Sequence, residues 1–449
     1  MSSLQVIPDG YKQTDYGIIP EDWNFKTIGE IASVSSGGTP NRKVPEFWDG
    51  DIPWVTTTLI NGHAISYANE YITKKGLDLS SAKMCRSGTL LMAMYGQGKT
   101  RGKVGVLSFD ASINQACAAI SLTDSRSNEY VLHVLNSMYE DIRELSNSGG
   151  QENLSGGIIK GISMPFPSFE EQTAIANALS DVDALLSELE KLIAKKQAIK
   201  TATMQQLLTG KTRLPAFVKY KNGKSSNHIE GNNLQNQAGI APEGWGRVTL
   251  GHDATLKARI GWQALTTKEY LEFGPRLLVT GTDFNAGIVD WNSCCYVSEW
   301  RYKQDFNIQL REGDVLVTKD GTIGKVGYVS KLPLEATLNS GVFVIRPKNK
   351  KFVPKFLFYV LNSSIFTDFI RAITAGSTIT HLYQRDFVNF GFYAPTEEEQ
   401  TAIATILSNM DEEIQALKQR LSKTRQIKQG MMQELLTGKT RLIQGEAHD

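Results

Sequence analysis

Three Gly-Lys-Thr triplets are the residues in this sequence whose spacing suggests chemistry. One closes "AMYGQGKT", which runs from Ala93 to Thr100, and two lie in "LLTGKTRL", which ends at Leu214 and again at Leu442. In a phosphate-binding loop this triplet follows a glycine or alanine at a fixed spacing, and backbone N–H groups hold the phosphates. Such loops would make the chain a nucleotide-binding protein, so the elements around them must be considered.

A phosphate-binding loop needs a strand before it and a helix after it. "AMYGQGKT" follows a strand-like run, but "RGKVGVLSF" comes next, and its glycines and β-branched residues indicate a hairpin. The two later triplets have Gln205 and Gln433 where the first glycine should stand, and they lie at predicted helix ends, where the dipole repels anions. We therefore predict one hairpin and two helix ends. A nucleotide-hydrolysing enzyme that uses Lys99 and Thr100 stays as an alternative.

The composition indicates a soluble protein of two or more domains, with 449 residues, 41% hydrophobic and 21% charged. No apolar run approaches the roughly 20 residues that span a bilayer, and the N-terminus lacks a signal-peptide pattern, so we expect a cytoplasmic location. A net charge of +1 argues against a protein that holds nucleic acid by bulk electrostatics alone. It permits base recognition with partners that supply phosphate contacts.

Cysteine and histidine spacing predicts no metal site. The cysteines show no CxxC pattern and the six histidines no HExxH pattern. Motifs of serine hydrolases and of amino-methyltransferases are also missing from the sequence. We therefore predict a binding protein with no catalytic residues and no cofactor of its own.

The chain contains an internal repeat. The segment from Pro167 to Leu214 aligns without a gap with the segment from Pro395 to Leu442, and about half of the positions are identical. Fainter matches precede each copy: "IPEDW" with "APEGW", "GKVG" with "GKVG", and "HVLNS" with "YVLNS". The order is a variable domain, a repeated segment, a second variable domain and a second repeated segment.

Each repeated segment is predicted to form one long helix. Ser168 and Thr396 are expected N-caps, and Glu171 and Glu399 three residues later would complete capping boxes. The glycine of each "LLTGKTRL" would end the helix, and the lysine and arginine after it would offset the last carbonyl groups. Some 40 residues would give a rod of roughly 60 Å.

Both helices carry an apolar seam with heptad spacing, the pattern of helices that pack along their length. The seam residues are Ile175, Leu179, Val182, Leu186, Leu189 and Ile193 in the first copy, and Ile403, Leu407, Met410, Ile414, Leu417 and Leu421 in the second. Each helix could instead pack only on its neighbouring domain, but two matching seams would then lack partners. We expect an antiparallel coiled coil with pseudo-two-fold symmetry.

The fold class is α+β, since short apolar strands such as "GTLLMAM" and "VFVIRP" alternate with amphipathic helices in both variable domains. The expected boundaries are an N-terminal segment 1–18, domain 1 at 19–166, helix 1 at 167–213, a polar linker at 214–240, domain 2 at 241–394, helix 2 at 395–442 and a tail at 443–449.

Loops that mix glycine with Lys, Arg, Gln, Asn and an aromatic residue suit nucleic acid, because glycine permits close approach and the polar side chains match phosphates and base edges. Such loops recur in both domains, although each single residue could equally lie in a solvated turn. The candidate DNA-binding residues are Arg42, Thr57, Tyr95, Gln97, Lys99, Arg101, Gln151 and Asn153 in domain 1, and Arg259, Trp262, Gln263, Lys319, Thr322, Ser377, Thr378 and His381 in domain 2.

With these features the chain resembles the DNA-specificity subunits of type I restriction-modification systems over almost its whole length. The resemblance is carried by "IPEDW" and "APEGW", "SGGTPNRK", "RIGWQALTTKEY" and the two "EEQTAIA…LLTGKTRL" segments. It implies two target-recognition domains, each recognising one half of a bipartite, asymmetric sequence in double-stranded DNA. It also implies that the paired helices set the spacer.

The resemblance further implies that the helices dock two modification (methyltransferase) subunits and that restriction (translocase and nuclease) subunits join them. Adenine methylation and DNA cleavage would lie on those partners, with S-adenosylmethionine, ATP and Mg²⁺, and no membrane would be involved. A coiled-coil scaffold with two domains that bind something other than DNA stays as a second alternative.

Overall fold

The chain folds into two compact units in a computed structural model that describes residues 7–96, 99–145, 153–218, 220–221, 224–225, 242–260, 265–285, 287–374 and 381–443. Unit 1 comprises Met1–Glu190 and Gln419–Asp449, and unit 2 comprises Lys191–Lys418. Each unit therefore combines one variable domain with part of both repeated helices. The unit boundary falls inside the helices, and not at their ends, because each helix is anchored in both cores.

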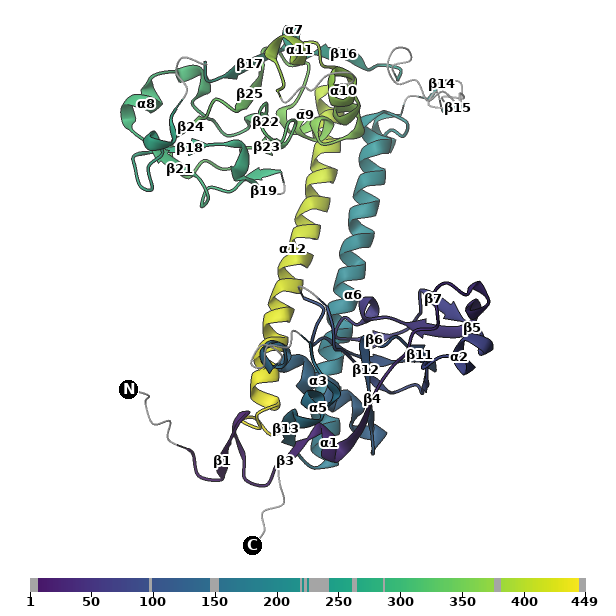
Figure 1. Cartoon of the computed structure of the whole chain (residues 1–449). Coiled ribbons are helices and arrows are strands. Elements are labelled where there is room, and N and C mark those ends of the chain that lie inside the picture. Colours follow the sequence, from purple (N-terminus) through teal and green to yellow (C-terminus); the bar gives the residue numbers. More distant parts are fainter. Residues whose placement is uncertain are drawn as a thin grey trace. The chain divides into compact units, whose positions relative to one another are not determined.

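Unit 1 is built on two sheets (Figure 1). The first has the order β4 (Ala32–Ser36), β12 (Cys117–Leu122), β9 (Leu90–Ala93), β10 (Val104–Leu107), β6 (Ala64–Ile65), and the second the order β7 (Glu70–Ile72), β5 (Trp48–Val55), β11 (Ala111–Ile113), β8 (Met84–Cys85). Leu90 and Met92 of β9 point into one apolar cluster, while Leu91 and Ala93 point into another. Because successive strand residues face opposite sides, a strand covered on both faces is apolar throughout, as "LLMA" is.

Unit 2 repeats this topology. Its larger sheet has the order β17 (Ala254–Ala258), β25 (Val342–Pro347), β22 (Val315–Thr318), β23 (Val326–Tyr328), β20 (Ile288–Val289), β19 (Phe284–Asn285), and its smaller sheet the order β21 (Cys295–Val297), β18 (Arg276–Val279), β24 (Ala336–Leu338). The unusual parallel pairs recur as well: β10 with β6 and β11 with β5 in unit 1 match β23 with β20 and β24 with β18 in unit 2. The faint sequence matches between the two domains therefore reflect one fold, as predicted.

Short strands and helices complete each unit. In unit 1 these are β1 (Tyr11–Thr14), β2 (Gly17–Pro20), β3 (Asn24–Thr27), α1 (Ile28–Ile31), α2 (Lys74–Asp78), α3 (Asn128–Ser137), α4 (Tyr139–Leu145), α5 (Gly156–Gly161) and β13 (Ser163–Phe166). In unit 2 they are β16 (Gly246–Thr249), α7 (Leu250–Asp253), α8 (Glu299–Lys303), α9 (Pro354–Leu361), α10 (Ser364–Thr374), α11 (Gln384–Phe387) and β26 (Gly391–Ala394). Of the described helices, none alone is long and apolar enough to cross a membrane. The pair α9 and α10, bent by 57°, passes that test by length and composition.

The two repeated segments are single long helices, α6 (Phe169–Leu208) and α12 (Glu397–Leu435). Within each unit they lie side by side and antiparallel (Figure 1). The ion pairs between them show this, since residue numbers increase along α6 while those of the paired residues decrease along α12. The ion pairs are Asp183–Lys428 (2.6 Å) and Glu190–Arg425 (2.6 Å) in unit 1, and Lys196–Glu413 (2.6 Å) and Lys200–Asp411 (2.5 Å) in unit 2. Asp183–Lys428 and Asp411–Lys200 are equivalent positions of the repeat.

All twelve seam residues lie buried or half-buried. Ile175 and Leu179 at the start of α6 belong to the core of unit 1, while Leu207 and Leu208 at its end belong to the core of unit 2. For α12 the order is reversed, since it starts in the core of unit 2 and ends with Leu435 and Leu436 in that of unit 1. Each long helix is therefore fixed at both ends by apolar burial.

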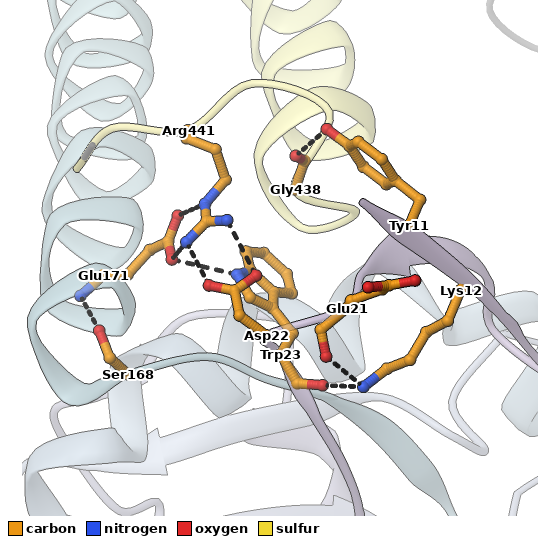
Figure 2. Close-up of polar contacts among 9 residues, drawn as sticks. All are labelled: Tyr11, Lys12, Glu21, Asp22, Trp23, Ser168, Glu171, Gly438 and Arg441. Carbon is orange, nitrogen blue, oxygen red and sulfur yellow. Dashed lines mark hydrogen bonds and ion pairs between the residues drawn. The ribbon is translucent and has the colours of Figure 1, made fainter. Parts of the chain in front are cut away.

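The predicted capping box of α6 is only half formed. The hydroxyl of Ser168 accepts from the backbone N–H of Glu171 (3.3 Å), as an N-cap should. However, the carboxylate of Glu171 accepts from Arg441 and Trp23 instead of returning to the backbone of the cap (Figure 2). Glu399 likewise accepts from Arg213. The prediction that the arginines offset the last helix carbonyls was wrong. A carboxylate accepts two charge-assisted hydrogen bonds from one guanidinium and therefore binds it more strongly than a backbone carbonyl does.

The predicted polar linker at 214–240 lies largely outside the described residues. Its described part contains a 3-10 turn at Pro215–Phe217 and a short antiparallel pair of β14 (Tyr220–Lys221) with β15 (Lys224–Ser225).

Candidate nucleic-acid interface

Three loops of unit 1 meet at one edge of the five-stranded sheet. Strand β4 ends where β12 begins, with Ser36 opposite Ala118, and β9 ends beside the same point. The loop after β9 is fixed there by two backbone hydrogen bonds, from the N–H of Met94 to the carbonyl of Ala116 (2.8 Å) and from the N–H of Leu154 to the carbonyl of Met94 (3.0 Å). The loop before α5 is thereby held against the hairpin loop.

Unit 2 holds the equivalent loops in the same way. The N–H of Lys319 donates to the carbonyl of Gly341 (2.9 Å), and the N–H of Leu382 donates to the carbonyl of Lys319 (2.8 Å). An isolated bridge joins Asp320 to His381. The two units therefore present one backbone framework with different side chains.

The loop that contains "AMYGQGKT" connects the antiparallel strands β9 and β10. Gly102 has a φ of +85° and its N–H donates to the carbonyl of Ala93 (2.9 Å), while Gly324 has a φ of +80° and donates to Thr318 (2.9 Å). These glycines close a hairpin in each unit, as predicted for the first. A helix does not follow, so the backbone cannot direct a helix N-terminus at phosphates.

The exposed candidates of unit 1 at this edge are Tyr95, Lys99 and Asn153, while Thr57 and Arg101 are half-buried. The carbonyl of Lys99 accepts from the hydroxyl of Tyr139 on α4 (2.6 Å), which holds the hairpin loop in place. Gln97 and Gln151 lie outside the described residues.

Arg42 is held by an acidic and two aromatic side chains. Its guanidinium lies 3.9 Å from the ring centre of Trp48 and 4.9 Å from that of Trp54, and both terminal nitrogens donate to Glu70. This hydrogen bonding lowers the pKa of Glu70. Glu70 was not predicted, although it stands opposite Trp54 in the β5–β7 register. Only that strand pairing could have revealed it.

The candidates of unit 2 are arranged differently. Thr322 is exposed at the hairpin tip, and the amine of Lys319 lies 5.7 Å from the ring centre of Phe343. His381 forms an ion pair with Asp320 through Nδ1 when it is protonated, and its ring lies 4.9 Å from that of Tyr383. Trp262, Gln263, Ser377 and Thr378 lie outside the described residues.

A polar hollow of about 490 Å³ opens beside the loop edge of unit 1. Ser36, Gly37 and Ile113 line it, together with the exposed Lys83 and Arg86. These two cations add positive charge to the wall of the hollow.

Comparison with known proteins shows that the two units are two copies of one known domain. The sequence signature of the Type I restriction modification DNA specificity domain matches residues 20–201 and 278–426 of this chain, once in each half. The chain belongs to this family.

Relatives cover the chain almost completely. The Type I restriction enzyme MjaIX specificity subunit of Methanocaldococcus jannaschii is 24% identical over 440 residues, which is 96% of either chain. The crystal structure of the S subunit from M. genitalium has a TM-score of 0.58 at 18% identity and covers 95% of this chain and 98% of that one. A second structure, from work on complex assembly and conformational transition of the type I R-M system, has a TM-score of 0.52 at 17% identity. The match covers 94% of this chain and 99% of that one. The predicted specificity-subunit fold is confirmed.

Membership in the DNA-specificity family assigns sequence-specific DNA recognition to this chain and leaves the nucleotide-hydrolysing alternative without support. One candidate must nevertheless be corrected. Arg259 is only 2% exposed, and its Nε donates to the carbonyl of Leu338 (2.9 Å) while Nη2 donates to Thr337 (3.2 Å). Burial lowers the pKa of its guanidinium. Arg259 joins the end of β17 to β24, so the prediction that it contacts DNA is withdrawn.

Proposed function

We propose that this chain is the target-recognition subunit of a type I restriction-modification assembly, in which the loop edge of each unit recognises one half of a bipartite DNA sequence. The observation that carries the proposal is the duplicated framework. Met94 and Lys319 make the same two backbone hydrogen bonds, whereas the neighbouring positions differ: Tyr95 and Asn153 in unit 1, Asp320 and His381 in unit 2. One framework with two side-chain sets fits two different half-sites.

Direct DNA contacts are proposed for the exposed residues Tyr95, Lys99, Asn153 and Thr322, and for the half-buried Lys319 and His381. Tyr95, Lys99 and Asn153 would act in unit 1, and Lys319, Thr322 and His381 in unit 2. Lysine supplies phosphate contacts, and asparagine and histidine donate to or accept from base edges. The partly exposed candidates Thr57 and Arg101 would line the same edge.

Arg42 would contact DNA after exchanging partners. In the structure both terminal nitrogens of the Arg42 guanidinium donate to Glu70, and the guanidinium lies against the two indole rings. A guanine edge or a phosphate offers the same pair of acceptors as a carboxylate. On DNA binding, a guanine edge or a phosphate would therefore take the place of the Glu70 carboxylate as the hydrogen-bond partner of Arg42. The two indole rings would keep the guanidinium oriented during this exchange.

Partner subunits would dock on the long helices. In unit 2, Leu192 and Ile199 of α6 are 38% and 42% exposed and stand seven residues apart, outside the seam shared with α12. Exposed apolar residues at heptad spacing suit a further helix. We assign that place to the modification subunits, of which two are expected. Methyl transfer to adenine and, with restriction subunits, ATP-driven cleavage would occur on those partners.

The test is a gel-shift experiment with this chain and its modification subunits on DNA carrying the modified sequence of the host. A shift that survives excess unrelated DNA, and that is lost when either half-site is altered, is expected. A shift that ignores both half-sites would instead support a scaffold. An ATPase activity of the isolated chain that Lys99→Ala abolishes would favour the nucleotide-hydrolysing alternative.

A further inference from the structure

The C-terminal end of each long helix docks on the opening segment of a variable domain. In unit 1 the end of α12 contacts Pro20 and Trp23, and in unit 2 the end of α6 contacts Pro242 and Trp245. A Cβ added to Gly438 would lie 2.5 Å from Pro20, and one added to Gly210 would lie 2.4 Å from Pro242. Both glycines also have a φ near +68°. The repeated "TGKTR" is therefore a docking segment as well as a helix end.

An arginine then binds a buried glutamate in each unit. Arg441 donates to Glu171 from Nε (2.5 Å) and Nη2 (2.7 Å), and Arg213 donates to both oxygens of Glu399. In each case the arginine follows the end of one long helix, and the glutamate lies in the first turn of the other. Thus far the two units match.

Unit 1 adds a second carboxylate. Asp22 accepts from Nη1 (3.1 Å) and Nη2 (2.9 Å) of Arg441, so one guanidinium joins the domain opening to α6 (Figure 2). The indole N–H of Trp23 donates to Glu171 (3.0 Å), and the hydroxyl of Tyr11 donates to the carbonyl of Gly438 (3.1 Å). We call Asp22, Trp23, Glu171 and Arg441 the Arg441 cluster.

Among the described residues, unit 2 lacks the counterparts of the Asp22 and Trp23 contacts. Gly244 stands where unit 1 has Asp22, and the remaining guanidinium nitrogen of Arg213 donates to the carbonyl of Glu243 (3.1 Å). The buried indole nitrogen of Trp245 has no hydrogen-bond partner among the described residues. The difference is therefore a missing carboxylate rather than a different fold.

The two docking contacts also differ in connectivity. Arg213 and Glu243 are 30 positions apart along the chain, so a short segment keeps the end of α6 near the opening of domain 2. Arg441 and Asp22 are 419 positions apart, and no short segment limits their separation. Closing the longer segment costs more entropy, and the extra contacts of unit 1 offset part of that cost.

We propose that Asp22 and Arg441 are positioning residues that hold target-recognition domain 1 on the end of α12, so that recognition of one half-site depends on a surface ion pair. The inference rests on the proposed function. Asp22 is 61% exposed, so its attraction to Arg441 is screened by salt, whereas Arg213 and Glu399 are 8% and 0% exposed and are screened little. Salt or loss of the Asp22 charge therefore loosens domain 1 and not domain 2.

The test compares Asp22→Asn with Glu21→Gln in the full chain bound to its modification subunits. Glu21 is the adjacent exposed carboxylate and lies outside the Arg441 cluster, so the charge change is matched. The measured quantity is discrimination, the ratio of affinities for the target and for DNA altered in one half-site. Tyr95→Ala identifies the half-site that domain 1 recognises. Asp22→Asn should lower discrimination at that half-site roughly two- to fivefold, the worth of a surface ion pair.

Hydrogen exchange supplies a second readout. Backbone amides at 436–443 should exchange roughly two- to fivefold faster in Asp22→Asn at low salt, and the wild type should match the variant at 1 M salt. Amides at 208–214 should not change. Equal loss of discrimination at both half-sites, or no loss at either, would overturn the proposal. If Tyr95→Ala also leaves discrimination unchanged at both half-sites, the proposed loop edge fails as well, which separates the two failures.

Discussion

Arg213 donates from Nε and Nη2 to the carboxylate of Glu399, and this ion pair is almost completely buried, with 8% and 0% of the two side chains exposed. Its counterpart in unit 1 is less enclosed, since Arg441 is 28% exposed and Glu171 also accepts from Trp23. The same repeated sequence thus produces one buried pair with a single carboxylate and one partly solvated network with two carboxylates.

This difference predicts unequal costs for the two arginines. Arg213→Ala leaves the carboxylate of Glu399 buried without the guanidinium and should lower the free energy of unfolding by about 3–5 kcal/mol. Arg441→Ala should cost less, because Trp23 still donates to Glu171. Urea denaturation measures both, and Arg213→Ala combined with Glu399→Gln should recover part of the loss. Equal costs would contradict this account.

The sequence predicted the long helices and the duplicated fold because apolar spacing and repeated segments are properties of the chain itself. It did not predict what Glu171 and Arg441 do, because their contact joins positions 270 apart and depends on how the helices pair. Arg259 was misassigned for a related reason. Its neighbours, which mix a glycine with polar and aromatic residues, suggested a surface loop, whereas tertiary packing places it against Leu338.

Burial of His133 predicts a stability that depends on pH. Its Nε2 lies 3.1 Å from the hydroxyl of Ser180, and its side chain is almost fully enclosed. Burial, reinforced by Lys428, lowers the pKa of His133 to about 4, from about 6.5 in an unfolded chain. The unfolded state therefore takes up the proton first, so stability present above pH 6.5 is lost as the pH falls toward 4, by about 1.4 kcal/mol per pH unit.

Urea denaturation across pH 4 to 7 measures this loss, and His133→Gln should flatten the dependence. In unit 2 the equivalent position is Tyr359, whose hydroxyl lies 3.1 Å from Ser408, and a tyrosine does not titrate in this range. An unchanged pH dependence in the variant would show that another group is responsible.

Lys99 and Lys319 should each contact one DNA phosphate. Lys99→Ala and Lys319→Ala should weaken binding on all sequences alike and reduce the slope of log affinity against log salt by about one unit each. Lys348→Ala is the matched control, because Lys348 follows the end of β25 that is remote from the loops, where its amine donates to the carbonyl of Gly251 (3.2 Å). A control that reduces the slope as much as the two variants would rule out this placement.

The helices should set the spacer between half-sites. Seven residues inserted into α6 after Glu188 and into α12 after Ala416 preserve the heptad seam and lengthen each helix by about 10 Å. The unrecognised spacer should widen by about three base pairs while both half-sites stay the same. Methylation assays on a library of spacer lengths measure this. New half-sites at the original spacer length would refute it.

The central claim, that one chain recognises two half-sites through two equivalent loop edges, is tested most directly by mapping methylated adenines in a genome where this chain and its modification subunits are expressed. The account predicts modified sites that share two different constant sequences at one fixed separation, with no constraint on the base pairs between them. A single uninterrupted motif, or two identical half-sites, would contradict it.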